Sequence, residues 1–115
     1  MSKKVPGIVQ ISNDVLADLA GMAALEGYGI VGMASPSLRD GVAQLLSREK
    51  LRKGVVIANE EEGVHVDLYV VMEHGTNLAQ VSANLAERVK YVLTSYADVA
   101  VSDVGIHVQG IKVHK

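Results

Sequence analysis

Apolar residues recur along the chain with two different periods, and each period predicts a type of secondary structure. Steps of three and four residues predict an amphipathic helix over residues 14–26. The same spacing predicts a helix that is capped by Thr76 or Asn77 and a further helix over residues 38–53. Ser12, Asn13 and Asp14 offer an N-cap for the first helix. The apolar positions of the helix after Asn77 are Leu78, Val81, Leu85, Val89, Val92 and Tyr96.

Strict alternation of apolar and more polar residues predicts strands. Residues 64–72 alternate in this way, and a glutamate-rich turn joins them to a strand over residues 55–59, so the two form a hairpin. Shorter strands are predicted over residues 7–11 and 30–34. A last strand covers residues 99–113, where the alternation changes register near Ser102 and predicts a bulge.

The resulting order, β-α-β-α-β-β-α-β, predicts an α+β fold. Strand 64–72 has one continuous apolar face and one largely polar face, which is typical of an antiparallel sheet covered on one side. We therefore expect a mostly antiparallel sheet, with the helices that carry Val15 and Val81 packed on one face. The 115 residues suffice for one domain, over residues 1–115.

Composition and charge exclude several classes of functional site and of binding partner. The chain has no cysteine, which excludes disulfides, thiolate metal sites and cysteine nucleophiles. A net charge of −2 argues against electrostatic binding to nucleic acid. The most apolar stretch, residues 15–34, carries Asp18 and Glu26 and is broken by glycines, so no membrane span is expected. No signal peptide is apparent, and we expect a cytoplasmic location.

Candidate chemistry is sparse. The sequence contains no G-x-S-x-G, P-loop or H-E-x-x-H motif, so we expect no enzyme activity and no catalytic residue. His65 and Asp67 share one face of a predicted strand and could supply two metal ligands. Nothing in the sequence brings His107 near them, and spacing alone is weak evidence, so neither a metal nor a cofactor is expected.

The Gly27–Gly32 turn offers an alternative function. Gly27-Tyr28-Gly29-Ile30-Val31-Gly32 matches the dinucleotide pattern G-x-G-x-x-G, and its second half matches the GXXG loop of KH domains. However, a helix precedes this turn and a strand follows it, which is the reverse of the dinucleotide arrangement. A small ligand- or nucleic-acid-binding module that uses this turn remains the alternative hypothesis.

Two surfaces are candidates for contacts with other molecules. Arg48, Lys50, Arg52 and Lys53 form a basic surface for a partner protein, anionic lipid or nucleic acid, or they are simply a solvated helix face. The last strand is long and apolar, and an uncovered strand edge invites pairing with another chain. We therefore expect a homo-oligomer that associates through Val104, Ile106 and Val108.

An ordered series of glycine-punctuated apolar segments carries a family resemblance. It includes Gly7-x-Val9-x-Ile11-Ser12, Gly29-Ile30-Val31-Gly32-Met33, Val66-Asp67-Leu68-Tyr69-Val70-Val71, His74-Gly75-x-Asn77 and Val104-x-Ile106-x-Val108. Over roughly residues 6–112, this series resembles the alkaline-shock-protein family of Gram-positive envelope stress proteins.

The resemblance implies a non-catalytic cytoplasmic interaction or scaffold protein linked to envelope stress or homeostasis. The resemblance also implies self-association, since some members of this family are able to self-associate and are held at the membrane by a separate membrane-anchor protein, here expected at its inner face. Some short members are encoded beside a fatty-acid-kinase-like protein, which is therefore a second candidate partner. The family supplies no catalytic residues, so none is carried over to this chain.

Overall fold

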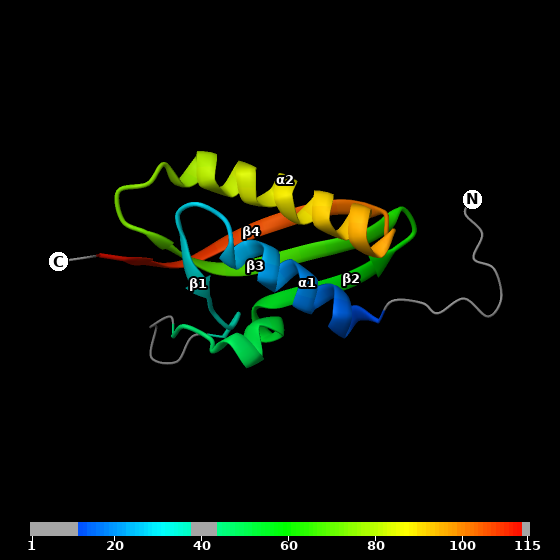
Figure 1. Ribbon diagram of the computed structural model, residues 1–115, viewed down its shortest axis with the longest axis horizontal. Helices are drawn as coiled ribbons and strands as arrows, with labels where there is room; N and C mark the ends of the chain where they lie inside the picture. The colour runs from blue at the N-terminus through cyan, green and yellow to red at the C-terminus, as the bar shows by residue number, and fades with distance from the viewer. Residues whose placement is uncertain (1–11, 38–43, 114–115) are drawn as a thin grey trace.

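The computed structural model describes residues 12–37 and 44–113. The strand predicted over residues 7–11 and the first part of the helix predicted over residues 38–53 lie outside these ranges. Within them the chain forms, in order, α1 (Asn13–Leu25), β1 (Ile30–Met33), the 3-10 helix η1 (Arg48–Gly54), β2 (Val55–Glu60), β3 (Gly63–Glu73), α2 (Leu78–Ala97) and β4 (Val101–Lys112) (Figure 1).

The long strand β3 is the centre of the sheet. Along one edge it pairs antiparallel with β1 and with β2, and along the other edge it pairs with β4. The predicted α+β fold with a mostly antiparallel sheet is confirmed. β4 is the exception, because it runs parallel to β3, from the pair Val64–Val101 to the pair Glu73–Lys112. Helix α2 connects β3 to β4 and carries the chain back to the same end of the sheet, as a parallel connection requires.

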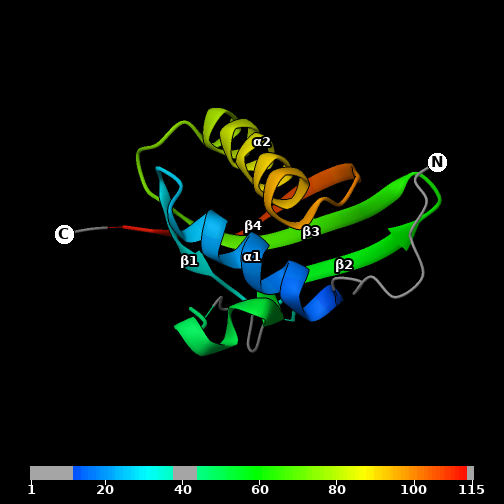
Figure 2. The ribbon, with the colours of Figure 1, turned by 45° about the vertical axis from the view of Figure 1, so that its right-hand side comes forward.

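Both α-helices cover the same face of the sheet (Figure 2). The predicted alternation in β3 is confirmed, because Val64, Val66, Leu68, Val70 and Met72 are all buried. They form one core with the inner faces of the two helices, which contribute Leu16, Ala20, Ala24, Val81, Leu85, Val89 and Leu93. The small alanines of α1 let its backbone lie close to the sheet, so a four-stranded sheet and two helices bury a continuous apolar layer.

The predicted helix starts are confirmed by side-chain caps. The Ser12 hydroxyl accepts a hydrogen bond from the backbone N–H of Val15, and Asn77 Oδ1 accepts one from the backbone N–H of Gln80. The apolar face of α2 differs from the prediction at its ends. Leu78 and Tyr96 are 40% and 75% exposed, and Leu93 and Ala97 complete the buried face instead.

The helix predicted over residues 38–53 is wrong at residues 44–47, and from Arg48 onward it is a 3-10 helix. Residues 44–47 are not helical, because Leu45 forms a β-bridge with Ala34 and the backbone N–H of Leu46 donates to the carbonyl of Met33. This pairing with the end of β1 holds the segment extended. Only η1 is helical, and its backbone is kinked at Lys50.

The bulge predicted near Ser102 is confirmed. Val101 pairs with Val64 and Asp103 pairs with His65, so Ser102 is an extra residue in β4. A second irregularity falls at Gln109, between the pairs Val70–Val108 and Val71–Gly110. Within the described ranges, none of the helices has the length and apolar character needed to cross a lipid bilayer.

Candidate functional site

The sheet face opposite the helices carries a group of four titratable side chains that contact one another. On β3, His65 and Asp67 alternate with the buried core positions and therefore point to this face. The β3–β4 register brings Asp103 beside His65 and His107 beside Tyr69. We call His65, Asp67, Asp103 and His107 the interstrand cluster.

Asp67 is the centre of the interstrand cluster. Its Oδ1 atom lies 2.9 Å from Nε2 of His107 and 3.2 Å from Nε2 of His65. The side chains of Asp67 and His65 are 23% and 27% exposed, and that of His107 is 44% exposed. The ring of His107 also stacks on Tyr69, with 4.5 Å between centroids and 11° between planes. Two strands thus hold two imidazoles on one carboxylate.

Gly105 leaves the space that the Asp67 side chain occupies. It is the register partner of Asp67 on β4, and a Cβ atom at this position would lie 2.5 Å from Asp67 Oδ1. Any other residue would therefore displace the carboxylate from the imidazoles.

The environment of Asp67 favours its charged form. Burial acts to raise the pKa of Asp67. Hydrogen bonds from His107 and His65, together with the charge of these imidazoles, outweigh burial and hold the pKa below its ordinary value of 3.8. The carboxylate therefore stays ionised and accepts hydrogen bonds over the physiological pH range.

Asp67→Asn is expected to lower the free energy of unfolding by about 1–2 kcal/mol near neutral pH, because charge-assisted hydrogen bonds are lost. A depressed folded-state pKa stabilises the protein above about pH 4, where the unfolded carboxyl titrates, and this stability is lost as the pH falls through the lower folded value. The difference between wild type and variant should thus shrink as the pH falls below about 4. Urea unfolding at several pH values measures it, and a difference that is independent of pH would contradict the assignment.

Sequence reasoning missed that His107 belongs beside His65 and Asp67. The missing information is the parallel register of β4, together with the extra residue at Ser102 that shifts it. In the part of the chain that the structure describes, no three His, Cys, Asp or Glu side chains are grouped so that they could hold a metal ion. The two imidazoles can donate hydrogen bonds to the Asp67 carboxylate and so tie β3 to β4.

The predicted basic residues lie together on η1, but they are not equivalent. The Arg52 guanidinium bonds Asp18 through Nε and Nη2, at 3.1 and 2.9 Å, and contacts Asp14 through Nη1 at 3.0 Å. The hydrogen bond and charge of Asp18 raise the pKa of Arg52. Arg52 therefore fastens η1 to α1, and Arg48, Lys50 and Lys53 are the exposed remainder of the predicted basic surface.

Arg52→Glu is expected to lower the melting temperature by roughly 2–4 °C, because a third carboxylate would face Asp14 and Asp18. Lys53→Glu is the matched control, since Lys53 is exposed on the same short helix and should leave the melting temperature nearly unchanged. Differential scanning calorimetry at low salt compares the two variants. Equal effects of both changes would show that the Arg52 contacts contribute nothing specific.

The three residues predicted for self-association lie on β4 and differ in exposure. Val104 and Ile106 pack against the core, whereas Val108 is 37% exposed. Ile111 and Val113 continue the apolar strip toward the C-terminus and are 41% and 57% exposed. Within residues 12–37 and 44–113, no strand pairs with the second edge of β4.

The Gly27–Gly32 turn connects α1 to β1, so a helix precedes it and a strand follows it, as the sequence predicts. The chain adopts a positive φ of 85° at Gly29, which favours glycine. A Cβ atom there would also lie 2.9 Å from Val81 Cγ2. A pocket of about 320 Å³ lies beside this turn and is lined by Gly27, Tyr28, Val81, Asn84 and Arg88. The Arg88 side chain bonds Glu26 and the carbonyl of Ala23, at the end of α1.

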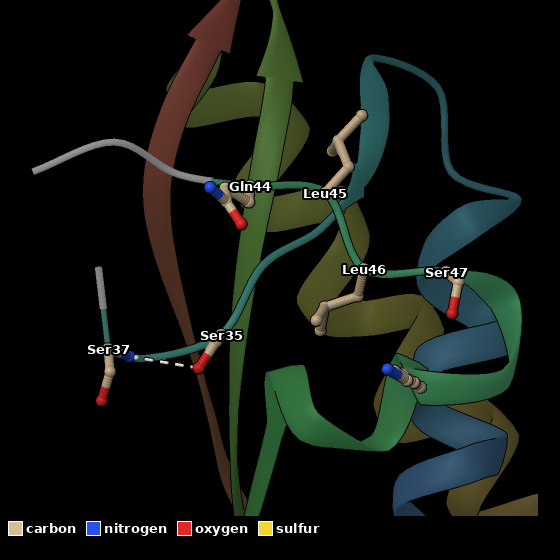
Figure 3. A pocket seen from close by; sticks show the side chains of 7 residues that line it. Ser35, Ser37, Gln44, Leu45, Leu46 and Ser47 are labelled. Carbon is tan, nitrogen blue, oxygen red and sulfur yellow. Dashed lines mark hydrogen bonds between the residues drawn. The ribbon is translucent and has the colours of Figure 1, made fainter. Parts of the chain in front are cut away.

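A second pocket, of about 560 Å³, lies where the chain leaves β1 and returns toward η1 (Figure 3). Its lining includes Ser35, Ser37, Leu45, Leu46 and Lys50. Gln109 of β4 donates to the carbonyls of Ser35 and Pro36, which fixes this segment across β3. Its lining residues flank positions 38–43, which lie outside the described ranges, and we assign it no ligand.

Comparison with known proteins identifies the family. A protein-family model matches residues 1–113, and it describes the alkaline shock protein 23 family, with a cell envelope-related function. The chain is 41% identical to the uncharacterized protein YloU of Bacillus subtilis over 108 residues, covering 93% of this chain and 90% of YloU. It is 42% identical to the uncharacterized protein Spy1614 of Streptococcus pyogenes over 108 residues, covering 93% of this chain and 89% of Spy1614.

A more distant relative, the uncharacterized protein YqhY of Bacillus subtilis, is 27% identical over 106 residues, covering 92% of this chain and 78% of YqhY. No solved structure matches the chain. The resemblance noted in the sequence is therefore confirmed, and the chain belongs to the alkaline shock protein 23 family, which has a cell envelope-related function.

Proposed function

We propose that this chain is a non-catalytic interaction protein that serves the cell envelope by associating with itself and with partner proteins. The envelope-related function of the family supports the biological setting. The observation that carries the proposal is β4, a strand of 12 residues that pairs with β3 along one edge only, among the residues described. An unpaired strand edge of this length is a template for pairing with another chain.

Self-association uses the free edge of β4 together with its exposed apolar side chains. Val108 and Ile111 are exposed on the side of β4 that faces the helices, because they are the register partners of the buried Val70 and Met72. A second copy that pairs along this edge would extend the sheet and cover both side chains. Val104 and Ile106 instead stabilise the protomer, so replacing them would report on folding rather than on association.

Val108→Glu is expected to raise the dissociation constant of the homo-oligomer at least about tenfold, because a charge replaces apolar surface at the interface. Val56→Glu is the matched control, since Val56 has similar exposure, 42%, but lies on β2. Light scattering over a wide concentration range measures the mass of each protein. A monomer mass at every wild-type concentration, or equal effects of the two changes, would refute association through β4.

Partner recruitment uses the exposed basic residues of η1. Arg48, Lys50 and Lys53 lie at the opposite end of β2 from the acidic turn at residues 60–62, so positive and negative charge are separated along the molecule. An acidic surface of a membrane-anchor protein or of a fatty-acid-kinase-like protein fits this end. Such a partner would hold the chain at the inner face of the membrane.

The test reverses Arg48, Lys50 and Lys53 to Glu and leaves Arg52 in place, so that η1 remains attached to α1. Crosslinking and pull-down from cells should then recover less of the partner, and the membrane-associated fraction should fall. Unchanged recovery and localisation in a folded variant would show that these residues only solvate the surface.

The pocket beside the Gly27–Gly32 turn supports a second candidate, a small-ligand-binding module. Tyr28 is 82% exposed at its rim, and Asn84 presents an amide within it. Thermal-shift screening with small metabolites tests this candidate, with Asn84→Leu as the variant that should abolish any stabilisation. A screen in which no compound raises the melting temperature would leave the interaction function as the better account.

A further inference from the structure

The pocket beside the Gly27–Gly32 turn has a polar wall on α2. Asn84 and Arg88 both line the pocket, and they lie about one helical turn apart, so their side chains share one face of the helix. Gln80 lies one turn earlier, and its Nε2 donates a hydrogen bond to Asn84 Oδ1 at 3.0 Å. This bond uses the side-chain oxygen of Asn84 and leaves its NH2 group to donate to another molecule.

The guanidinium of Arg88 is fixed at the same wall. Its Nε donates to the carbonyl of Ala23 at 3.2 Å, and its Nη2 bonds the carboxylate of Glu26, which also lines the pocket. A guanidinium has more N–H groups than these bonds use, and a carboxylate accepts more than one hydrogen bond. The ion pair therefore leaves the wall without net charge, and the wall still offers both donors and acceptors.

The rest of the pocket is apolar and aromatic. Val81 and Leu85 line it and belong to the buried core, so they present fixed apolar surface. Tyr28 lines it from the turn and is exposed. The face of an exposed aromatic ring can stack on another flat ring, and such stacking would remove apolar surface of Tyr28 from water.

The size and chemistry of the pocket restrict its ligand. A volume of about 320 Å³ lies at the lower end of the range for small-molecule sites, roughly 300–1,000 Å³, so it suits one ring system rather than a dinucleotide. A flat ring would contact Tyr28 and the core side chains. Its edge would need a carbonyl oxygen for Asn84 and Arg88 and an N–H group for Glu26. Because the wall has no net charge, it does not favour an anionic ligand.

We propose that this pocket binds an uncharged planar heterocycle with an amide-type edge, the chemistry of a free nucleobase or of nicotinamide. Tyr28 stacks on the ring, and Asn84, Arg88 and Glu26 bond its edge. The inference rests on the second candidate function, the small-ligand-binding module, and gives the class of its ligand. It does not depend on self-association or on a partner protein.

The experiment titrates the full chain with uracil, hypoxanthine and nicotinamide, and it follows backbone amide shifts by NMR. At least one of these compounds should bind with a dissociation constant of about 1 mM or below and shift the amides of residues 26–29 and 81–88. Two control compounds each lack one feature. Benzoate has a flat ring but an anionic edge, and cyclohexanecarboxamide has an amide but no flat ring. Both should bind at least about tenfold more weakly.

Variants place the ligand in this pocket. Tyr28→Ala should weaken binding about tenfold or more, whereas Tyr28→Phe keeps the ring and should bind like the wild type. Asn84→Leu should weaken binding because a donor is lost. Tyr91→Ala is the matched control, since Tyr91 is also exposed and lies on α2 but does not line the pocket. Tyr28 and Asn84 are exposed, so these variants should fold normally.

Three results would overturn the proposal. If none of the three heterocycles shifts any amide at about 10 mM, the proposed ligand class is wrong, and the thermal-shift screen of other metabolites then decides the second candidate function separately. If benzoate binds as tightly as the heterocycles, the class is also wrong, although the pocket remains a ligand site. Binding that Tyr28→Ala and Asn84→Leu leave unchanged would show that the heterocycle binds elsewhere.

Discussion

Leu68→Ala is expected to lower the free energy of unfolding by about 3–5 kcal/mol, the cost of a cavity at a fully buried leucine. Leu68 is 0% exposed in the middle of β3, which pairs with every other strand of the described sheet. A domain of this size has a total stability of about 5–15 kcal/mol, so the variant should be partly unfolded at physiological temperature. Urea unfolding followed by circular dichroism measures the loss.

Leu78→Ala is the matched control for this change. Leu78 is also a leucine, but it is 40% exposed at the start of α2. Its truncation should cost less than about 1 kcal/mol, because little buried surface and no closed cavity are involved. Similar losses at the two positions would contradict the placement of the core on the helix-covered face of β3.

Gly63→Ala is expected to cost about 2–4 kcal/mol, since backbone strain and a steric clash act together. Gly63 begins β3 with a φ of 137°, and a Cβ atom there would lie 2.6 Å from the carbonyl oxygen of Ala100. That same oxygen accepts a hydrogen bond from the backbone N–H of Val64, so the clash would disturb the connection that leads into β4.

Gly75→Ala separates the two causes. Gly75 also has a positive φ, 92°, but no atom lies within 4 Å of an added Cβ. Its replacement should cost about 1–2 kcal/mol, from strain alone. Thermal unfolding of both variants gives the comparison, and an equal cost at the two glycines would show that the approach of Ala100 does not constrain β3.

Sequence patterns predicted the elements whose burial is periodic. The alternation in β3, the caps at Ser12 and Asn77 and the extra residue at Ser102 all follow from local sequence and all occur in the structure. The helix predicted over residues 38–53 failed at residues 44–47 because a distant partner, the end of β1, takes up the backbone of Leu46. Local periodicity contains no information about such a contact.

The candidate site was only partly predictable for the same reason. The pairing of His65 with Asp67 follows from strand alternation, but the approach of His107 depends on the direction and register of β4. Likewise, the four basic residues of the segment after Ser47 are alike in sequence. Only the position of α1 shows that Arg52 is bound to Asp14 and Asp18.

The parallel pairing of β4 with β3 has a consequence for the order of folding. The hairpin of β2 and β3 joins neighbours in the chain, whereas Val101 reaches Val64 only after the whole of α2 has been made and has docked. Contacts that are distant in sequence carry a loop-closure cost and form late. During synthesis, one edge of β3 therefore stays unpaired until the residues of β4 have been made. In that interval the unpaired strand edge exposes the chain to aggregation.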